Sequence, residues 1–243
     1  MTMKLYSWDI SPYSARVRMQ IYAKGLTDIA IEPAPTLTQK FYQDHPIGRI
    51  PFLETDREAI PESDVIAEYL EEIHPEPSLL GANPRENAHI RTLMRIGDIY
   101  LMNNTFMLSV QTRVLAGQTS VEGIIALLGG QLASNTKALD RMIGQGGFAC
   151  LGRLTLADCA LVPALFYLQY VLQGKGLADP IAANANVAAY WAEIQKQEHA
   201  ARILAELRRG VEERQEQIRS GELEKLRAAS RAAREAVERA PSP

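Results

Sequence analysis

Cysteine is scarce in this chain, because its 243 residues include only Cys150 and Cys159. Two cysteines do not form the framework of bridges on which small secreted proteins depend. Cys159 lies in an apolar stretch, where a small buried thiol is the expected role. Four histidines are present: His45, His74, His89 and His199. Their spacing is not that of metal ligands, so the sequence predicts neither a disulfide scaffold nor a metal centre.

A strong charge of one sign and long apolar runs are also missing. The formal net charge is −3, and no basic cluster is interleaved with aromatic residues, which argues against a nucleic-acid partner. No apolar run reaches the ~20 residues that cross a membrane. The opening residues, Met1-Thr2-Met3-Lys4, lead into a strand pattern rather than a signal peptide. We therefore expect a cytoplasmic protein without nucleic-acid or membrane partners.

The chain divides into segments of different character. Three prolines and a glycine cluster at Pro75, Pro77, Gly81 and Pro84, which indicates a linker. Before this linker strand and helix patterns alternate, and after it the chain is almost wholly helical. The expected domains are residues 1–78, residues 86–207, and a charged helical or flexible tail at residues 208–243.

The first segment has the order of elements of a thioredoxin-like sandwich. Ser11 and Pro12 form a strong helix start, with serine as N-cap and proline at the first helical position, and Gly25 marks the end of that helix. The expected elements are a strand at 4–7, a helix at 12–24, a strand at 29–31, a short helix or irregular segment at 37–42, two strands around Phe52 with a hairpin near Asp56, and a helix at 64–73.

The second segment is expected to be a helical core. The apolar residues between Ile90 and Leu101 fall on several helix faces, so this helix should be mostly buried. A second long helix is expected at about 121–143. Thr155-Leu156-Ala157-Asp158 resembles a capping box at the start of a further core helix. The tail carries charges of both signs at helical spacing, which favours an exposed, solvated helix over a functional lid.

Pro51 interrupts an apolar run, Ile50 to Leu53, that otherwise predicts a strand. Because proline has no N–H to donate, we expect an edge strand entered through a turn, with a cis Ile50–Pro51 bond as one solution. That geometry leaves the main chain of Ile50 free to pair with an extended guest. Ser63 is then expected as the N-cap of the next helix, whose N-terminus can bind an anion. A free backbone edge beside a carboxylate site suits a short acidic peptide.

These residues resemble the glutathione-binding domain of glutathione S-transferases. The motifs are Gly48-x-Ile50-Pro51-x-Leu53, Glu62-Ser63-x-x-Ile66-x-x-Tyr69-Leu70, Leu5-Tyr6-Ser7, Ser11-Pro12-Tyr13-Ser14 and Leu154-Thr155-Leu156-Ala157-Asp158. The resemblance covers roughly residues 3–205. It implies an N-terminal thioredoxin-like α/β domain followed by a C-terminal all-helical (all-α) domain, glutathione as co-substrate, and a homodimer.

The resemblance also implies roles for individual residues. Ser11 takes the position of the catalytic serine or cysteine of the family, and its spacing after Tyr6 is that of the zeta- and omega-like classes. Ile50 and Pro51 would hold the cysteinyl unit of glutathione, while Glu62 would bind its ammonium and Ser63 its γ-glutamyl carboxylate. Ser14 and Tyr6 remain alternatives as thiolate donors, and Ser11 as a plain helix cap is the structural alternative.

The function implied is attack of the glutathione thiolate on a small apolar electrophile. Serine, unlike cysteine, cannot form a mixed disulfide with glutathione, which disfavours thiol–disulfide exchange. One alternative is a glutathione-dependent isomerase, ether-cleaving enzyme or dehalogenase on the same fold. Another is a non-catalytic interaction module whose contact surface is the charged tail. Candidates for the electrophile pocket are Tyr100, Asn103, Asn104 and Met107.

Overall fold

The computed structural model describes residues 3–45, 47–114 and 121–239. The chain forms two compact units: residues 1–75 together with 205–243, and residues 76–204. The boundary falls inside one helix, α9 (Glu198–Arg219). The domain limits expected from the sequence remain predictions, but the tail residues group with the N-terminal residues rather than standing apart.

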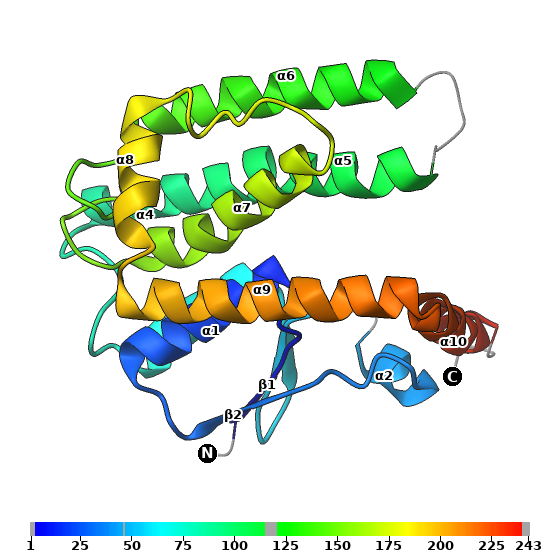
Figure 1. Ribbon diagram of the computed structural model, residues 1–243. Helices are drawn as coiled ribbons and strands as arrows, with labels where there is room; N and C mark the ends of the chain where they lie inside the picture. The colour runs from blue at the N-terminus through cyan, green and yellow to red at the C-terminus, as the bar shows by residue number, and fades with distance from the viewer. Residues whose placement is uncertain (1–2, 46, 115–120, 240–243) are drawn as a thin grey trace. The chain divides into compact units, whose positions relative to one another are not determined.

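The first unit is built on a four-stranded sheet in the order β2-β1-β3-β4 (Figure 1). Strand β1 is parallel to β2 and antiparallel to β3, which is antiparallel to β4. The strands are β1 (Met3–Tyr6), β2 (Ile29–Glu32), β3 (Phe52–Glu54) and β4 (Ala59–Pro61), and the helices are α1 (Pro12–Lys24), α2 (Gln39–Asp44) and α3 (Ser63–Ile73). This arrangement confirms the predicted thioredoxin-like sandwich.

Apolar side chains cover both faces of this sheet. Leu5 and Leu53 pack with Val17 of α1 and Leu70 of α3 in one buried cluster. Phe41 of α2 packs with Phe52 in a second cluster. The helices of the first unit therefore sit where the alternation of side chains along the strands directs apolar groups.

Two sequence expectations about the first unit are corrected, one for strand β3 and one for helix α3. Strand β3 lies between β1 and β4 and is not an edge strand. It accommodates Pro51 because the strand starts at Phe52, so the missing N–H of the proline falls outside the ladder. Helix α3 begins one residue earlier than expected: Ser63 is its first residue and Glu62 holds the N-cap position. The carbonyl of Glu62 accepts the first helical hydrogen bond, from the N–H of Ile66 at 2.9 Å.

The tail forms two helices, the end of α9 and α10 (Glu222–Glu238), and both pack on the first unit (Figure 1). Val211 and Leu223 of the tail are buried, as is Leu207 just before it. The Tyr42 hydroxyl of α2 lies 2.5 Å from the Ser230 hydroxyl of α10. One face of the tail is therefore packed, because isolated apolar residues at helical spacing supply a buried stripe, while most of its other residues are exposed as expected.

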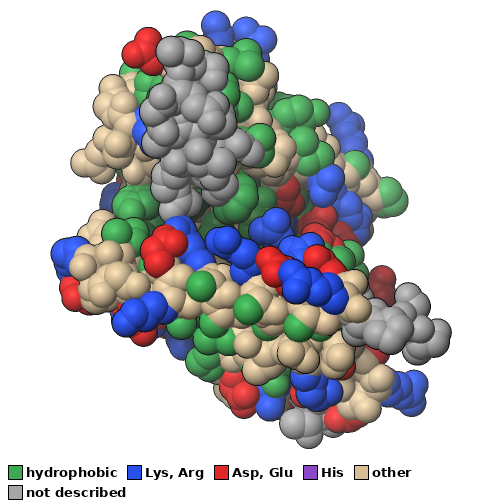
Figure 2. All heavy atoms as spheres, turned by 90° about the vertical axis from the view of Figure 1, so that its right-hand side faces the viewer, with side chains coloured by type: hydrophobic (Ala, Val, Ile, Leu, Met, Phe, Trp, Pro, Cys, Tyr) green, Lys and Arg blue, Asp and Glu red, His purple; other side chains and the backbone are tan. Residues whose placement is uncertain are grey.

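The expectation of stabilising pairs within the tail is borne out. Arg227 pairs with Glu224 three residues earlier, and Arg234 pairs with Glu238 four residues later. On the side of the first unit that carries α10, basic and acidic side chains are intermixed (Figure 2). Such exposed pairs contribute little to stability, ~0.3–0.5 kcal/mol each.

The second unit is helical (Figure 1). Its elements are α4 (Pro84–Arg95), the π-helical turn η1 (Ile96–Met102), α5 (Asn103–Val114), α6 (Val121–Asp140), α7 (Leu156–Gln173), α8 (Ala185–Ile194) and the start of α9. The stretch expected to be mostly buried is only partly so, since Ile99 and Tyr100 are 41% and 50% exposed. Both lie in η1, where i→i+5 bonding shifts residues off the face that an α-helix would bury.

Helix α7 is the core helix of the second unit. It is long and apolar enough to cross a membrane, but 72% of that stretch is buried inside the protein, as in an ordinary core helix. The predicted capping box at its start is present. The Asp158 carboxylate accepts from the Thr155 N–H at 2.8 Å and from the Ala149 N–H at 2.7 Å. Burial raises the pKa of this carboxyl group to about 6.

Candidate functional site

The register of the sheet brings the predicted site segments to the same end of the strands. Tyr6, the last residue of β1, lies opposite Glu32, the last residue of β2, and opposite Phe52, the first residue of β3. Phe52 in turn lies opposite Pro61, the last residue of β4. At this end of the sheet the chain leaves β1 toward Ser11, enters β3 from Ile50 and Pro51, and leaves β4 toward Glu62 and Ser63.

Ser11 is the N-cap of α1, as predicted. Its Oγ accepts the N–H of Ser14 at 3.2 Å, and its own N–H donates to the Trp8 carbonyl at 3.0 Å. A serine hydroxyl has two lone pairs that accept hydrogen bonds and one proton that it can donate. Capping the helix uses one lone pair and leaves the proton available. Among the described residues no acceptor is found for the proton of the Ser11 hydroxyl. The side chain can cap the helix and donate a hydrogen bond at the same time.

The two alternative thiolate donors are differently placed. Ser14 is fully buried, and its Oγ has no hydrogen-bond partner in the described structure. The ring of Tyr6 stacks on Phe52 with 4.5 Å between ring centroids, and the amino group of Lys4 lies 5.6 Å from its centre. Ser14 is thus enclosed in the first unit and the Tyr6 ring is engaged in stacking, whereas the half-buried Ser11 lies at a helix N-terminus.

The loop that leads to Ser11 is held by a buried arginine that the sequence did not reveal. Arg18 of α1 is 1% exposed. Its guanidinium donates to Ser7 Oγ, to the Trp8 carbonyl at 3.0 Å and to the Asp9 carbonyl at 3.2 Å. A planar fork of five donors suits such multiple contacts, which a lysine could not reproduce. Arg18 therefore sets the path of the chain between β1 and Ser11.

Helix α9 completes this clamp. The Glu206 carboxylate accepts from Arg18 Nε at 2.8 Å and from the Tyr22 hydroxyl at 3.0 Å. Arg209 donates to the Asp9 carboxylate at 2.8 Å. At Gly210 an added Cβ would lie 2.3 Å from the N atom of Ile10. Only glycine allows α9 to approach the loop this closely. No local sequence signal marks these partners, because they lie about 190 residues from the loop.

The peptide bond between Ile50 and Pro51 is cis. The ladder between β1 and β3 ends at the pair Tyr6–Phe52. In the described part of the chain no hydrogen bond engages the main chain of Ile50. Gly48, two residues earlier, has a φ of +61°, and a Cβ there would meet the Tyr42 ring at 2.9 Å. The segment before Pro51 thus presents free backbone groups, as the sequence led us to expect.

Glu62 has an unusual backbone. Its φ of +69° and ψ of 115° place a side-chain-bearing residue in a region that glycine favours, and strain of this kind concentrates at functional sites. The carboxylate is exposed, while Ser63 is buried at the start of α3. Asp64 of α3 accepts from Arg16 of α1 at 3.1 Å. This pair ties the first turn of α3 to the helix that begins after Ser11.

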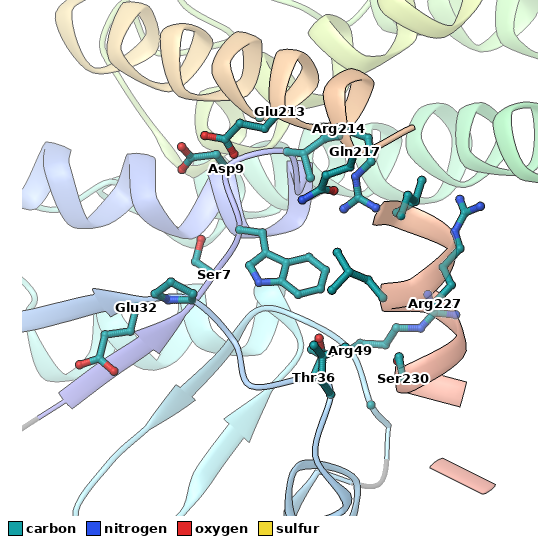
Figure 3. A pocket seen from close by; sticks show the side chains of 18 of the residues that line it. Ser7, Asp9, Glu32, Thr36, Arg49, Glu213, Arg214, Gln217, Arg227 and Ser230 are labelled. Atoms are coloured by element: carbon teal, nitrogen blue, oxygen red, sulfur yellow. The ribbon is translucent and has the colours of Figure 1, made fainter. Parts of the chain in front are cut away.

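A cavity of about 840 Å³ adjoins these segments within the first unit (Figure 3). It is lined by the loop at Ser7–Ile10, by the end of β2 and the segment after it, by Gly48 and Arg49, and by α9 and α10. None of the predicted site residues Ser11, Ile50, Pro51, Glu62 and Ser63 lines it. The cavity lies next to the end of β2, at one side of the sheet, whereas Glu62 and Ser63 follow β4 at the opposite side.

Other predicted candidates lie elsewhere. Tyr100 is in η1, and Asn103, Asn104 and Met107 are in α5 of the second unit, so their part in a site with residues of the first unit stays a prediction. Cys150 and Cys159 are both buried, and neither forms a disulfide among the described residues. Among the described residues no group of three or more His, Cys, Asp or Glu side chains is arranged to hold a metal ion.

The fold and the motifs around the cis proline define a class of protein. The model for the N-terminal domain of glutathione S-transferases matches residues 5–78, and that for the C-terminal domain matches residues 117–193. Maleylacetoacetate isomerase of Pseudomonas aeruginosa is 31% identical over 173 residues, which are 68% of this chain and 80% of that protein. The chain belongs to the glutathione S-transferase family, as the sequence motifs indicated.

Solved structures agree with this fold. Glutathione transferase Omega 3C from Trametes versicolor has a TM-score of 0.71 at 20% identity, covering 84% of this chain and 89% of that one. A glutathione S-transferase from Methylobacillus flagellatus, solved with glutathione bound, has a TM-score of 0.70 at 21% identity, covering 83% and 98%. The predicted order of a thioredoxin-like domain and a helical domain is confirmed.

Proposed function

We propose that this chain binds glutathione along the main chain before Pro51 and that Ser11 stabilises its thiolate for attack on a small electrophile. The observation that carries the proposal is the hydrogen bonding of Ser11. Its oxygen already accepts the Ser14 N–H, and its proton has no acceptor among the described residues. A sulfur placed beside it would accept that proton.

The other proposed contacts with glutathione involve residues at the same end of the sheet. The free N–H and C=O of Ile50 are suited to pair with the cysteinyl unit of an extended tripeptide. The exposed Glu62 carboxylate is suited to the α-ammonium of the γ-glutamyl unit. The α-carboxylate of that unit is suited to the N-terminus of α3, where Ser63 contributes a hydroxyl. In this arrangement the strained backbone of Glu62 serves to aim its side chain at the ligand.

The energetics are adequate without a metal or a general base. A thiol with an ordinary pKa near ~8.5 is only a few per cent ionised at neutral pH. Lowering that pKa by ~2 units takes ~2.7 kcal/mol of preferential stabilisation of the anion. A hydrogen bond to a charged group contributes ~1.5–3 kcal/mol, and the N-terminus of a helix ~0.3–1 kcal/mol. Ser11 at the start of α1 supplies both.

The step is a nucleophilic substitution or addition. The thiol loses its proton to solvent, and the thiolate electron pair forms a carbon–sulfur bond. In a substitution the leaving group departs with the electron pair of its own bond. In an addition to an electron-poor double bond, the displaced electron pair is taken up by a proton. Glutathione is consumed in either case.

A second candidate is isomerisation, in which the addition is reversed. After the thiolate adds to a carbon–carbon double bond, rotation about the resulting single bond and loss of the thiolate give the other geometric isomer. The observation that favours this candidate is the 31% identity with the isomerase of Pseudomonas aeruginosa over most of that protein. We also propose, from the family resemblance, that the chain forms a homodimer in the cytoplasm.

Substitutions at Ser11 separate catalysis from capping. Ser11→Ala removes both the hydroxyl and the cap, and costs ~1 kcal/mol of stability in addition to activity. Ser11→Gly removes the hydroxyl but retains a good N-cap, at a few tenths of a kcal/mol. We expect both variants to lower turnover by ~10²-fold or more and to raise the pKa of the thiol of bound glutathione. The ultraviolet absorbance of the thiolate, recorded against pH, measures that pKa. Normal turnover in Ser11→Gly would reduce Ser11 to a cap.

The fate of glutathione separates the two candidates. With a model electrophile that carries a leaving group, transfer consumes one thiol for each product molecule. With a cis double bond between electron-withdrawing groups, isomerisation leaves the free thiol unchanged while product accumulates. Titration of free thiol against product therefore distinguishes them. Failure of glutathione to bind at millimolar concentration would remove both and favour the interaction-module alternative.

A further inference from the structure

The segment that presents the main chain of Ile50 begins beside His45, the C-cap residue of α2. The N–H of His45 donates to the Phe41 carbonyl at 2.9 Å, and the carbonyl of His45 accepts the N–H of Gly48 at 2.8 Å. One residue therefore ties the segment both to the helix before it and to the turn within it. The glutathione contacts proposed above make no use of the His45 side chain.

The imidazole ring of His45 stacks on the residue that ends this segment. Its centroid lies 3.8 Å from that of Phe52, with 34° between the ring planes, and 5.2 Å from that of Phe41. Both phenylalanines are buried. Phe52 follows Pro51 and is the first residue of β3. The stack therefore closes the segment on itself, from the residue at its start to the residue that follows the cis proline.

The middle of the segment is held against the same helix. A Cβ at Gly48 would lie 2.9 Å from the ring of Tyr42, so this ring packs directly on the main chain of the segment. His45 and Tyr42, at the end of α2, thus contact the segment at two points. Ile50 lies between Gly48 and Phe52, and in the described structure its main chain has no hydrogen-bond partner. Its placement therefore depends on how these neighbours are held.

The ring of His45 is held by packing alone. Among the described residues neither of its nitrogens forms a hydrogen bond or an ion pair. A stacked pair of rings favours one arrangement over its alternatives by a factor of ~3–10. The ring contact is therefore strong enough to order the segment, and weak enough for the addition of a charge to release it.

Protonation of the ring opposes the stack. Burial lowers the pKa of His45, while the carboxylates of Asp44 and Glu54 act to raise it and Lys40 acts to lower it. Asp44 and Lys40 belong to α2 and are paired with each other at 2.7 Å, and Glu54 belongs to β3. Strand β1 contributes the neutral phenol of Tyr6, which stacks on the same phenylalanine as the imidazole.

The sign of the pH dependence follows from this lowered pKa. A histidine ring in water has a pKa of ~6.5, so a released His45 ring binds a proton more readily than the stacked ring does. The stack is therefore at full strength above pH ~6.5 and weakens as the pH falls below that value.

We propose that His45 is a positioning residue for glutathione: its neutral ring, stacked on Phe52, holds the segment before Pro51 in the form that pairs with the tripeptide, and protonation of the ring releases the segment. This role rests on the proposed function, because it concerns the same binding site. A ligand that pairs only with the ordered form binds more weakly in proportion to the fraction of protein in that form. Glutathione affinity, rather than the chemical step at Ser11, therefore depends on His45.

Calorimetric titration of the full chain with glutathione, from pH 7 to pH 5, tests this role. The carboxyl groups of glutathione have pKa values near ~3.5, and those of its amine and thiol are ~8 or above, so the charge of the ligand is nearly constant over this range. We expect the affinity of the original protein to fall ~3–10-fold from pH 7 to pH 5.

Three variants isolate the ring. His45→Ala loses the stack, so its affinity at pH 7 should be ~3–10-fold lower and should not change with pH. His45→Phe keeps an aromatic ring that does not titrate, so it should match the original protein within about twofold at pH 7 and retain that affinity at pH 5. His89→Ala removes a histidine of α4 in the second unit and should leave both the affinity and its pH dependence unchanged.

Steady-state kinetics separate positioning from a structural role. His45→Ala should raise the KM for glutathione ~3–10-fold at pH 7 with kcat within about twofold, because the hydroxyl of Ser11 is untouched. A lower kcat and a lower melting temperature at unchanged KM would make His45 a structural residue only and overturn the proposal.

Two results would overturn the role of His45 and leave the proposed function in place. One is equal glutathione affinity of His45→Ala and the original protein at pH 7. The other is an affinity of the original protein that is flat from pH 7 to pH 5. Absence of glutathione binding by the original protein at millimolar concentration would instead remove the proposed function, and this role with it.

Discussion

Glu206 and Arg18 form a buried ion pair that joins helix α9 to helix α1. The carboxylate lies 2.8 Å from Arg18 Nε, and the two side chains are 11% and 2% exposed. Arg18 uses its remaining donors on the loop that leads to Ser11. The pair therefore connects helix α9 to the position of the proposed catalytic hydroxyl, all within one compact unit.

The first prediction is that Glu206→Ala lowers the free energy of unfolding by ~3 kcal/mol, because the buried guanidinium of Arg18 loses its nearer counter-charge and keeps only the Asp9 carboxylate, at 3.9 Å. Arg18 is then held less firmly against the loop at Ser7–Asp9, so the turnover of glutathione should fall with stability. Urea unfolding measures the stability, and steady-state kinetics measure the turnover below the unfolding transition.

The control for this prediction lies on the same helix. Glu216 pairs with Arg219, and both side chains are about two-thirds exposed. Glu216→Ala should change stability by less than ~0.5 kcal/mol. If the two variants lose equal stability, the buried pair has no special role. Glu206→Gln, which keeps an acceptor for Arg18 and Tyr22, should fall between them.

The second prediction concerns Gly210, where a Cβ would approach backbone atoms of Asp9 and Ile10 at 2.8 and 2.3 Å. Gly210→Ala must displace either α9 or the loop, which we expect to cost ~1–3 kcal/mol. Gly130 of α6 offers a matched control, since nothing lies within 4 Å of its added Cβ. Gly130→Ala should stabilise the protein by ~0.5–1 kcal/mol through the helix propensity of alanine. Thermal unfolding of both variants checks the opposite signs.

The architecture of this protein is largely readable in its sequence because its signals are local. Ser11 and Gly25 bound α1 as predicted, and the αL conformation of Gly25 at φ 65° satisfies two carbonyls of the last turn. The Thr155–Asp158 capping box also lies within four residues. Chemistry of this kind depends on neighbours in the chain, so a single sequence is sufficient to identify it.

The rest could not be predicted, because it depends on contacts between distant segments. Arg18 looks like any polar residue of an amphipathic helix until Glu206 is placed beside it. The sparse apolar residues of the tail predict a solvated helix, yet Val211 and Leu223 are enough to bury one stripe of it. The residues of the candidate site come from the family motifs and stay a prediction. The cavity lined by the loop after β1, α9 and α10 could not be predicted, since its walls come from both ends of the chain.

The third prediction uses the strained backbone of Glu62 to separate stability from binding. Glu62→Gly relieves a φ of +69° and should raise the free energy of unfolding by ~0.5–2 kcal/mol. It also removes the carboxylate proposed to hold the glutathione ammonium, so affinity should fall ~10-fold or more. Glu62→Ala loses the same carboxylate without relief of strain. Calorimetric titration and thermal unfolding should show weaker binding in both variants but added stability in the glycine variant alone.

The fourth prediction concerns the pH dependence of stability that Asp158 confers. Burial raises the pKa of its carboxyl group to about 6 in the folded protein, while an unfolded aspartic acid has a pKa of ~3.9. Between these values the folded state holds the proton that the unfolded state has released. The unfolding free energy contributed by this group therefore falls as the pH rises from ~4 to ~6, and is constant above that. The full change is about 3 kcal/mol.

Asp158→Asn isolates this effect, because the amide does not titrate. The variant should be less stable at every pH, since one of the N–H groups of Thr155 and Ala149 would face the amide's own donor rather than an oxygen. The stability of the original protein minus that of the variant should decrease from pH ~4 to ~6, as the original loses the advantage of its raised pKa. Urea unfolding at half-unit pH steps measures this difference. A difference that is flat or rises across the window would show that the N–H donors outweigh burial in setting the pKa of Asp158.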